Sequence, residues 1–347
     1  MKRTVILLLS LMLIVSLAFG CSASKLTAKE IIIDGIDKNK DVQTMSIDGT
    51  VKLDIDLSQA NITSQELMYL QMISGIEFSY TGKQSIETKQ MEIAVQARAN
   101  FQEFDFTFDI PIILKDDILY VKIPALLKTL FPDSPLTDDI SKEFIAINLA
   151  EMAGEQKISQ EQDQELAIQL VKDLINSLDD SIFVKEDKKE FTLTSGTVDN
   201  AVSIVVTQDN LQPLLENFMT NGLPIITGYL EQLAIDSAQK EQLQQFKDHL
   251  NNSSQELEQA IQEIPNLVTI NTLRGTVVFD KKGFLRKGTF NADVIAHTET
   301  EGDIGITVSV EENIDNINSE VEFTMPTPTE EQIIDLTQLF NAQSPTY

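Results

Sequence analysis

The chain has 347 residues, a formal net charge of −28 and a single cysteine. So acidic a chain is repelled by nucleic acid and by anionic lipid headgroups, which excludes both as general electrostatic partners. One cysteine excludes a disulfide framework, so stability must come from an apolar core, for which 42% hydrophobic residues are sufficient.

The first 21 residues have the layout of a bacterial export signal. Lys2 and Arg3 form a positive start, residues 5–17 form an apolar run, and Gly20 precedes Cys21. The run is too short to span a bilayer, and no stop-transfer flank follows it. A cysteine at the cleavage position is typical of a lipoprotein signal, in which the thiol receives a diacylglyceryl group. An ordinary secretory signal with an incidental cysteine is the alternative. We expect a signal peptide at 1–20, lipidation at Cys21, a tether at 21–25 and one domain at 26–347.

The spacing of apolar residues then predicts the elements of the first half. A capped amphipathic helix is expected at 26–39 and a one-faced strand at 47–57. A short helix is expected at 63–73. Strands follow at 76–80, 93–99, 104–110, 112–114 and 118–123, with a small helix at 125–130.

The second half alternates helical and strand patterns. A capping box at Ser159 predicts a helix to 178, and two or three strands are expected between 182 and 207. Helices follow over 211–233, divided near Gly222 and Pro224, and continue to a short last turn from Ser253. Strands are expected at 268–279, 284–297, 304–310 and 321–325, with a terminal helix capped by Thr329. Grouped helices and sequential antiparallel strands indicate an α+β fold.

Four segments together resemble a known family. They are Leu26-Thr27-Ala28-Lys29-Glu30-Ile31, Ser46-Ile47-Asp48-Gly49, Asp280-Lys281-Lys282-Gly283 and Pro326-Thr327-Pro328-Thr329. With the lipoprotein signal, this layout resembles the LolA/LppX-like bacterial lipoproteins, especially their Gram-positive branch. The resemblance implies a curved antiparallel β-sheet, a half-barrel, with helices packed on its concave face and a cavity for acyl chains or lipid. It also implies attachment to the extracytoplasmic face of the cell membrane.

Side chains for catalysis or metal binding are scarce. The two histidines, His249 and His297, lack the context of a zinc site or of a nucleophile elbow. Asp37, Asn39 and Asp41 have the first spacings of a calcium loop, but Val42 replaces its glycine. We therefore expect no enzyme activity, no metal site and no cofactor.

Two apolar stripes are the candidate ligand-binding residues. Each stripe has two interpretations, because a stripe that lines an acyl-chain cavity can equally be part of the core. A break at Gly222-Leu223-Pro224 could act as a hinge that admits a ligand. The main hypothesis is a lipoprotein that binds or carries an apolar ligand, and the alternative is a docking or sensory module that binds another cell-envelope protein. The stripes comprise Phe104, Phe106 and Phe108 on a strand, and Phe218, Ile226 and Tyr229 on a helix.

Overall fold

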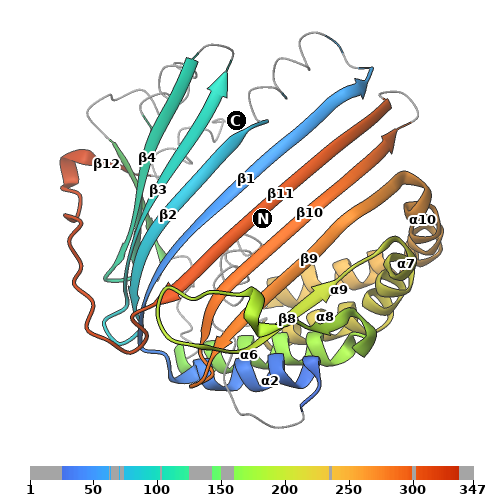
Figure 1. The fold of residues 1–347 in the computed structure, drawn as a ribbon, viewed down its shortest axis with the longest axis horizontal. Helices are drawn as coiled ribbons and strands as arrows, with labels where there is room; N and C mark the ends of the chain where they lie inside the picture. The colour runs from blue at the N-terminus through green and yellow to red at the C-terminus, as the bar shows by residue number, and fades with distance from the viewer. Residues whose placement is uncertain are drawn as a thin grey trace. The chain divides into compact units, whose positions relative to one another are not determined.

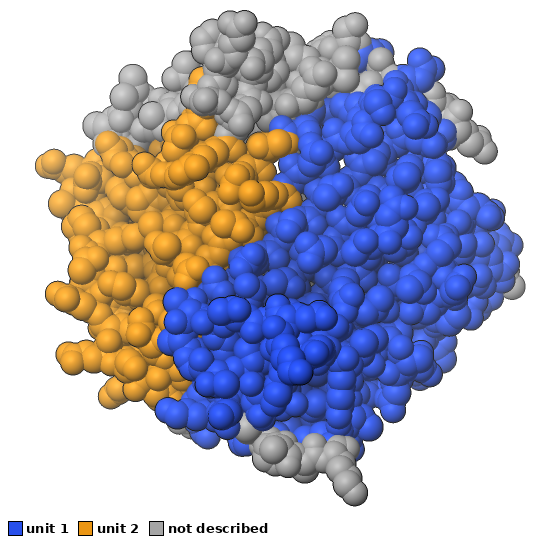
Figure 2. Space-filling model, in the orientation of Figure 1, with its two compact units in different colours: residues 1–41, 53–74, 158–313 blue, residues 42–52, 75–157, 314–347 orange. Residues whose placement is uncertain are grey.

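The computed structural model describes residues 26–61, 63, 70, 74–101, 104–124, 143–149, 160–233, 237–298 and 302–335. The chain divides into two compact units, which Figure 2 colours separately. Unit 1 comprises residues 1–41, 53–74 and 158–313, and unit 2 comprises residues 42–52, 75–157 and 314–347. The single domain expected at 26–347 stays a prediction. The signal peptide, Cys21 and the tether lie outside the described residues.

The described strands form a twelve-stranded sheet with the order β12-β6-β5-β4-β3-β2-β1-β11-β10-β9-β8-β7. Figure 1 shows the run from β4 through β1 to β11, β10 and β9. The pairs of known register are antiparallel except for β12 and β6, which are parallel. The predicted α+β class with a mostly antiparallel sheet is confirmed. The strands are β1 (Thr44–Ala60), β2 (Ile76–Ser85), β3 (Gln90–Phe101), β4 (Phe104–Lys115), β5 (Ile118–Lys122), β6 (Phe144–Asn148), β7 (Phe183–Lys185), β8 (Val198–Val205), β9 (Val268–Asp280), β10 (Leu285–Thr298), β11 (Gly302–Asp315) and β12 (Ile333–Asp335).

The long helices that the structure describes belong to unit 1. Helix α2 lies against β7 and β8, whereas α7 and α10 lie against β9. None of the described helices is both long enough and apolar enough to cross a bilayer. The helices are α2 (Ala28–Lys38), α6 (Gln160–Ser177), α7 (Gln208–Asn217), the π-helix η4 (Phe218–Gly222), α8 (Leu223–Leu233), α9 (Ser237–Asn252) and α10 (Ser254–Leu267). Short 3-10 turns are η1 (Asn39–Asp41), η2 (Asp180–Ile182), η3 (Lys188–Glu190) and η5 (Glu330–Gln332).

Helix α2 begins at the capping box that the sequence predicts. The Thr27 hydroxyl accepts from the Glu30 amide at 3.2 Å, and the Glu30 carboxylate accepts from the Thr27 amide at 2.6 Å. Ile31, Ile32 and Ile36 are buried on one stripe of this helix, which stabilises it against the sheet.

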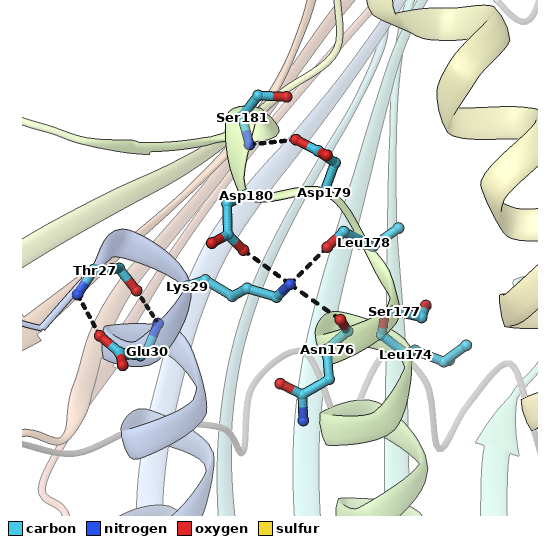
Figure 3. A network of polar contacts seen from close by, with 10 residues as sticks. All are labelled: Thr27, Lys29, Glu30, Leu174, Asn176, Ser177, Leu178, Asp179, Asp180 and Ser181. Atoms are coloured by element: carbon cyan, nitrogen blue, oxygen red, sulfur yellow. Dashed lines mark hydrogen bonds and ion pairs between the residues drawn. The ribbon is translucent and has the colours of Figure 1, made fainter.

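Lys29 joins the start of α2 to the end of α6 (Figure 3). Its ammonium group donates to the carbonyls of Asn176 at 3.0 Å and Leu178 at 2.6 Å, and pairs with Asp180 at 3.0 Å. A lysine bound to the last carbonyls of a helix satisfies acceptors that the helix itself leaves open. The N-terminal end of the described fold is therefore held firmly in unit 1.

The helical path from α7 to α8 does not break at Gly222 and Pro224. It passes through η4 with helical dihedral angles at both ends, and Gly222 is buried. A Cβ atom at Gly222 would lie 2.6 Å from the Phe218 ring, so the close packing there requires glycine. The division expected near Gly222 and Pro224 thus takes the form of a π turn, and its action as a hinge stays a prediction.

Three expectations for the C-terminal half are wrong. The segment from Val321 to Met325 forms no strand, and the buried Glu92 carboxylate accepts from the amides of Thr324 and Met325 at 2.8 and 2.7 Å. Residues 333–335 form β12 and not the start of the expected terminal helix, because they pair with β6. The rest of that helix, from residue 336 on, falls outside the described residues. The helix after Ser253 has 14 residues and is not a short turn. The helices expected at 63–73 and 125–130 fall largely or wholly outside the described residues.

Candidate functional site: apolar sheet faces

Alternating apolar residues of β9, β10 and β11 share one face of the sheet in unit 1. Phe290 is opposite Val310, and Val294 is opposite Ile306 in the β10–β11 pair. Directly opposite residues of an antiparallel pair point to the same side, so these side chains form one surface. We call it the β9–β11 apolar face; its members are Ile270, Leu273, Phe290, Ala292, Val294, Ala296, Ile304, Ile306, Val308 and Val310.

The other face of the same strands is polar. Asn271 donates to Asp293 at 3.1 Å, and Ser309 donates to Asn291 at 3.1 Å. A sheet with one polar and one apolar face normally packs the apolar face against a core. The β9–β11 apolar face is therefore the side on which helices, or a ligand, must lie.

Helices cover the β9–β11 apolar face only in part. Helix α10 contacts β9 and β10, and α7 contacts β9. Ala292 is buried, but the remaining members keep intermediate exposure or more, and 39% of Phe290 is exposed in the middle of β10. Large aromatic side chains left open at the centre of a sheet mark a surface that can accept an apolar ligand.

Strand β1 extends this face within unit 1. A Cβ atom at Gly305 would lie 3.1 Å from that of Asp56, and one at Gly302 would lie 2.4 Å from the Gln59 carbonyl oxygen. These two close approaches imply that β1 and β11 run antiparallel. In that register, Ile55 and Leu57 of β1 lie on the side of the β9–β11 apolar face. Gly302 has a φ of 78°, so the close approach at the end of β11 depends on glycine.

Unit 2 has an apolar face of its own, and the predicted strand stripe lies on it. Phe106 and Phe108 of β4 stack with ring centroids 6.3 Å apart and planes 8° apart, and 36% of Phe106 is exposed. Phe108 is opposite Ala97 of β3, and Ala97 is opposite Phe78 of β2. Phe104 begins β4, opposite Phe101. The alternation expected for this stripe is confirmed in β4, whereas its role in ligand binding stays a prediction.

The opposite side of β4, β5 and β6 is packed. Ile113, Tyr120 and Phe144 are buried there against Met325 and Ile333. The Phe106–Phe108 pair therefore lies on the face of β4 opposite the buried Ile113, and its Phe106 ring keeps 36% exposure.

The predicted helix stripe belongs to unit 1, whereas the aromatic pair belongs to unit 2. Phe218 is 38% exposed within η4, and Ile226 is partly buried on α8. Tyr229 is buried, and its hydroxyl accepts from the Leu170 amide of α6 at 3.1 Å. Burial raises the pKa of Tyr229 above its usual value, against a smaller opposing effect of that hydrogen bond. Tyr229 thus has a packing partner, whereas Phe218 presents an open ring.

His297 is the centre of a three-residue network that the sequence does not reveal. Its Nδ1 lies 2.9 Å from the Asp303 carboxylate, and its Nε2 lies 2.8 Å from the Thr269 hydroxyl. This order of groups resembles a nucleophile, a base and an orienting acid. The amides on either side of Thr269 already have acceptors, because the Val268 amide donates to the Ile264 carbonyl and the Ile270 amide donates to Gln208 Oε1 at 2.9 Å, so they are not arranged as oxyanion donors. We interpret the network as a cross-strand contact on the polar face.

Asp37 and Asn39, two of the residues with the spacing of a calcium loop, make other contacts at the end of α2. Asp37 pairs with Lys172 at 2.6 Å and Lys40 at 3.0 Å, and the Asn39 amide donates to the Gly35 carbonyl at 3.1 Å. Burial raises the pKa of Asp37, but its hydrogen bonds from Lys172 and Lys40 outweigh burial and hold the pKa below its usual value. Among the described residues, no three His, Cys, Asp or Glu side chains cluster as a metal site would need.

Comparisons with known proteins give similarity of fold at a low level. No family model matches the chain, and no curated protein matches it. The crystal structure of LprF from Mycobacterium bovis is similar over 87% of this chain and 97% of that chain, with 8% identity and a TM-score of 0.32. A structure of lipovitellin, titled for its lipid–protein interactions, is similar over 82% of this chain and 26% of that chain, with 6% identity and a TM-score of 0.22. Similarity at this level gives no information on function, so the function must be inferred from the apolar faces themselves.

Proposed function

We propose that this protein is an extracytoplasmic lipoprotein that binds or carries a lipid on the β9–β11 apolar face. A diacylglyceryl group on Cys21 would anchor it to the cell membrane, in keeping with a Gram-positive envelope. The protein would catalyse no reaction and would need no cofactor. The observation that carries the proposal is the open ring of Phe290 at the centre of an apolar sheet face.

An acyl chain is the ligand that best fits such a face. The face offers branched aliphatic side chains from three adjacent strands and a single aromatic ring, without a charged member. Moving an acyl chain from water onto it would gain about 0.8 kcal/mol for each buried methylene. A chain of ten buried methylenes would thus gain about 8 kcal/mol before the cost of ordering it.

Native mass spectrometry of the mature chain without Cys21 tests the proposal. The protein should copurify with a phospholipid or fatty acid, or take one up from mixed micelles. A Val294→Thr/Val308→Thr variant keeps side-chain shape but places two hydroxyl groups on the face. We expect it to lower loading on the order of tenfold or more, because each buried hydroxyl lacks a partner there.

Thr307→Val is the matched control. Thr307 neighbours Val308 in β11 but is exposed on the polar face, opposite Asp293. This variant should load as much lipid as the unchanged protein. Absence of loading in the unchanged protein, or equal loading in all three proteins, would refute lipid binding at this face.

A further inference from the structure

The β9–β11 apolar face is closed at the end where β10 begins. Phe279 of β9 is directly opposite Leu285 of β10, and both side chains are buried. Val202 of β8, opposite Val277, is buried on the same side of the sheet, and α2 lies against β8. A lipid headgroup placed among these side chains would lose its water without gaining partners, which is costly. A lipid on this face therefore has its headgroup at the other end.

The other end of the face changes from apolar to uncharged polar side chains. Ala296 of β10 is opposite Ile304 of β11, and one step further along the strands Thr298 is opposite Gly302. The close approach of Gly302 to the Gln59 carbonyl places Gln59 of β1 in this last row. Gln59 is exposed, and the Thr298 hydroxyl donates to the Gly302 carbonyl at 3.0 Å. In Figure 1 the arrowheads of β1 and β10 mark this end.

Two helix ends border the same end of the face. The Gln208 side chain, in the first turn of α7, donates to the carbonyls of Pro265 and Val268 at 2.9 and 3.0 Å. Val268 is in turn opposite Ala296 of β10. The start of α7 and the end of α10 therefore lie beside the end of β10. We call the segments that meet here the rim; they are residues 56–60, 208–210, 263–270, 295–298 and 302–305.

The charge of the rim is negative. Its segments, all of which the structure describes, contain four carboxylates and neither lysine nor arginine. Its one histidine, His297, is paired with one of these carboxylates at 2.9 Å. Like charges close to a binding site disfavour an anionic partner, whereas a headgroup without net charge avoids this cost. The four carboxylates belong to Asp56, Asp209, Glu263 and Asp303.

We propose that the row of Gln59 and Thr298 binds the headgroup of the carried lipid and that the rim selects a headgroup without net negative charge, either uncharged or zwitterionic. The inference rests on the proposed lipid binding at the β9–β11 apolar face. A primary amide both donates and accepts hydrogen bonds, so Gln59 suits the ester and hydroxyl groups of such a lipid. The selection itself comes from repulsion of anionic headgroups by the rim.

Competition between two lipids tests this selection. The mature chain without Cys21 is incubated in neutral detergent micelles with equal amounts of phosphatidylcholine and phosphatidylglycerol that carry the same acyl chains. Native mass spectrometry then gives the ratio of the two bound lipids. We expect bound phosphatidylcholine to exceed phosphatidylglycerol on the order of fivefold, and added salt to reduce this excess. Gln59→Lys places a positive charge in the last row and should abolish or reverse the excess.

Gln242→Lys is the matched control, because it makes the same substitution at an exposed position of α9, outside the rim. It should keep the ratio of the unchanged protein. Equal loading of the two lipids by the unchanged protein, or the same ratio in Gln59→Lys and Gln242→Lys, would overturn selection at the rim and leave lipid binding standing. Loading of neither lipid by the unchanged protein would overturn both.

Discussion

Phe290 of β10 is the direct cross-strand partner of Gly275 of β9, and its ring edge is 3.9 Å from the position that a Cβ atom of Gly275 would take. The glycine leaves room on β9 beside the ring, which remains 39% exposed. An aromatic ring over a strand glycine covers backbone, yet here its outer side stays open. This relationship makes Phe290 the residue whose loss should separate ligand binding from stability.

Phe290→Ser is expected to reduce lipid loading strongly and stability only moderately. Truncating a buried Phe typically lowers the free energy of unfolding by about 3–5 kcal/mol. Phe290 is half-exposed, so we expect a smaller loss of about 1–2 kcal/mol. Urea unfolding and native mass spectrometry on the same preparation check both values. Phe246→Ser is the control, because Phe246 on α9 is equally exposed at 43% but lies off the face. Similar loss of lipid from both variants would contradict a role for Phe290.

Tyr229→Phe should lower stability and leave lipid loading unchanged. The substitution removes the acceptor of the Leu170 amide, which should cost about 0.5–1.5 kcal/mol. Tyr229 has a pKa above its usual value, so the folded state holds the phenolic proton more tightly than the unfolded state. Stability should therefore fall as the pH rises above about 10, and this fall should be absent in the variant. Loss of lipid in Tyr229→Phe would instead place the hydroxyl at the ligand.

The elements could be predicted from sequence where local signals determine them. The Thr27 capping box and the alternation in β4, β10 and β11 are local, and the structure follows them. The alternation at Val321–Met325 is just as local but fails, because a carboxylate 232 residues away in sequence supplies the acceptor for Thr324. Ile333 and Ile334 likewise pair with β6, a strand far away in the sequence. Their helical spacing predicts a helix and gives no sign of this pairing.

The candidate site was harder to predict than the fold. The β9–β11 apolar face was present in the sequence as alternating residues in hairpin-linked strands, and this signal could have identified it. The exposed part of the face depends on how far α7 and α10 extend over the sheet. No pattern of residues in the sequence predicts this extent. The contact between His297 and Thr269 likewise depends on the register of β9 against β10.

Asp37→Asn should make stability less sensitive to acid. The pKa of Asp37 lies below its usual value, so its ion pairs stabilise the folded state above about pH 4 and are lost as the pH falls through the lowered pKa. The melting temperature of the unchanged protein should fall across that range more steeply than that of Asp37→Asn. Asp34→Asn on the same helix is the control and should keep the steeper slope. If the melting temperature fell with pH equally steeply in all three proteins, the ion pairs of Asp37 would not be the source of the acid sensitivity.

Glu92→Gln should loosen the segment at 317–325. An amide side chain keeps one acceptor oxygen where the carboxylate supplies two, so one part-buried amide, at Thr324 or Met325, loses its partner. Such a loss costs about 0.5–1.5 kcal/mol. Hydrogen exchange at these two amides should accelerate, whereas Glu320→Gln, an exposed change on the same segment, should have no effect. Unchanged exchange in Glu92→Gln would mean that other contacts hold the segment.

Photocrosslinking of a bound phospholipid that carries a diazirine in one acyl chain would locate the lipid on the protein directly. After loading and irradiation of the mature chain, peptide mass spectrometry identifies the modified residues. Lipid binding at the β9–β11 apolar face predicts modification of Phe290, Val294 and Val308, and none at Thr307 on the polar side. Modification confined to surfaces outside that face, or none above the level of an unloaded sample, would contradict lipid binding there.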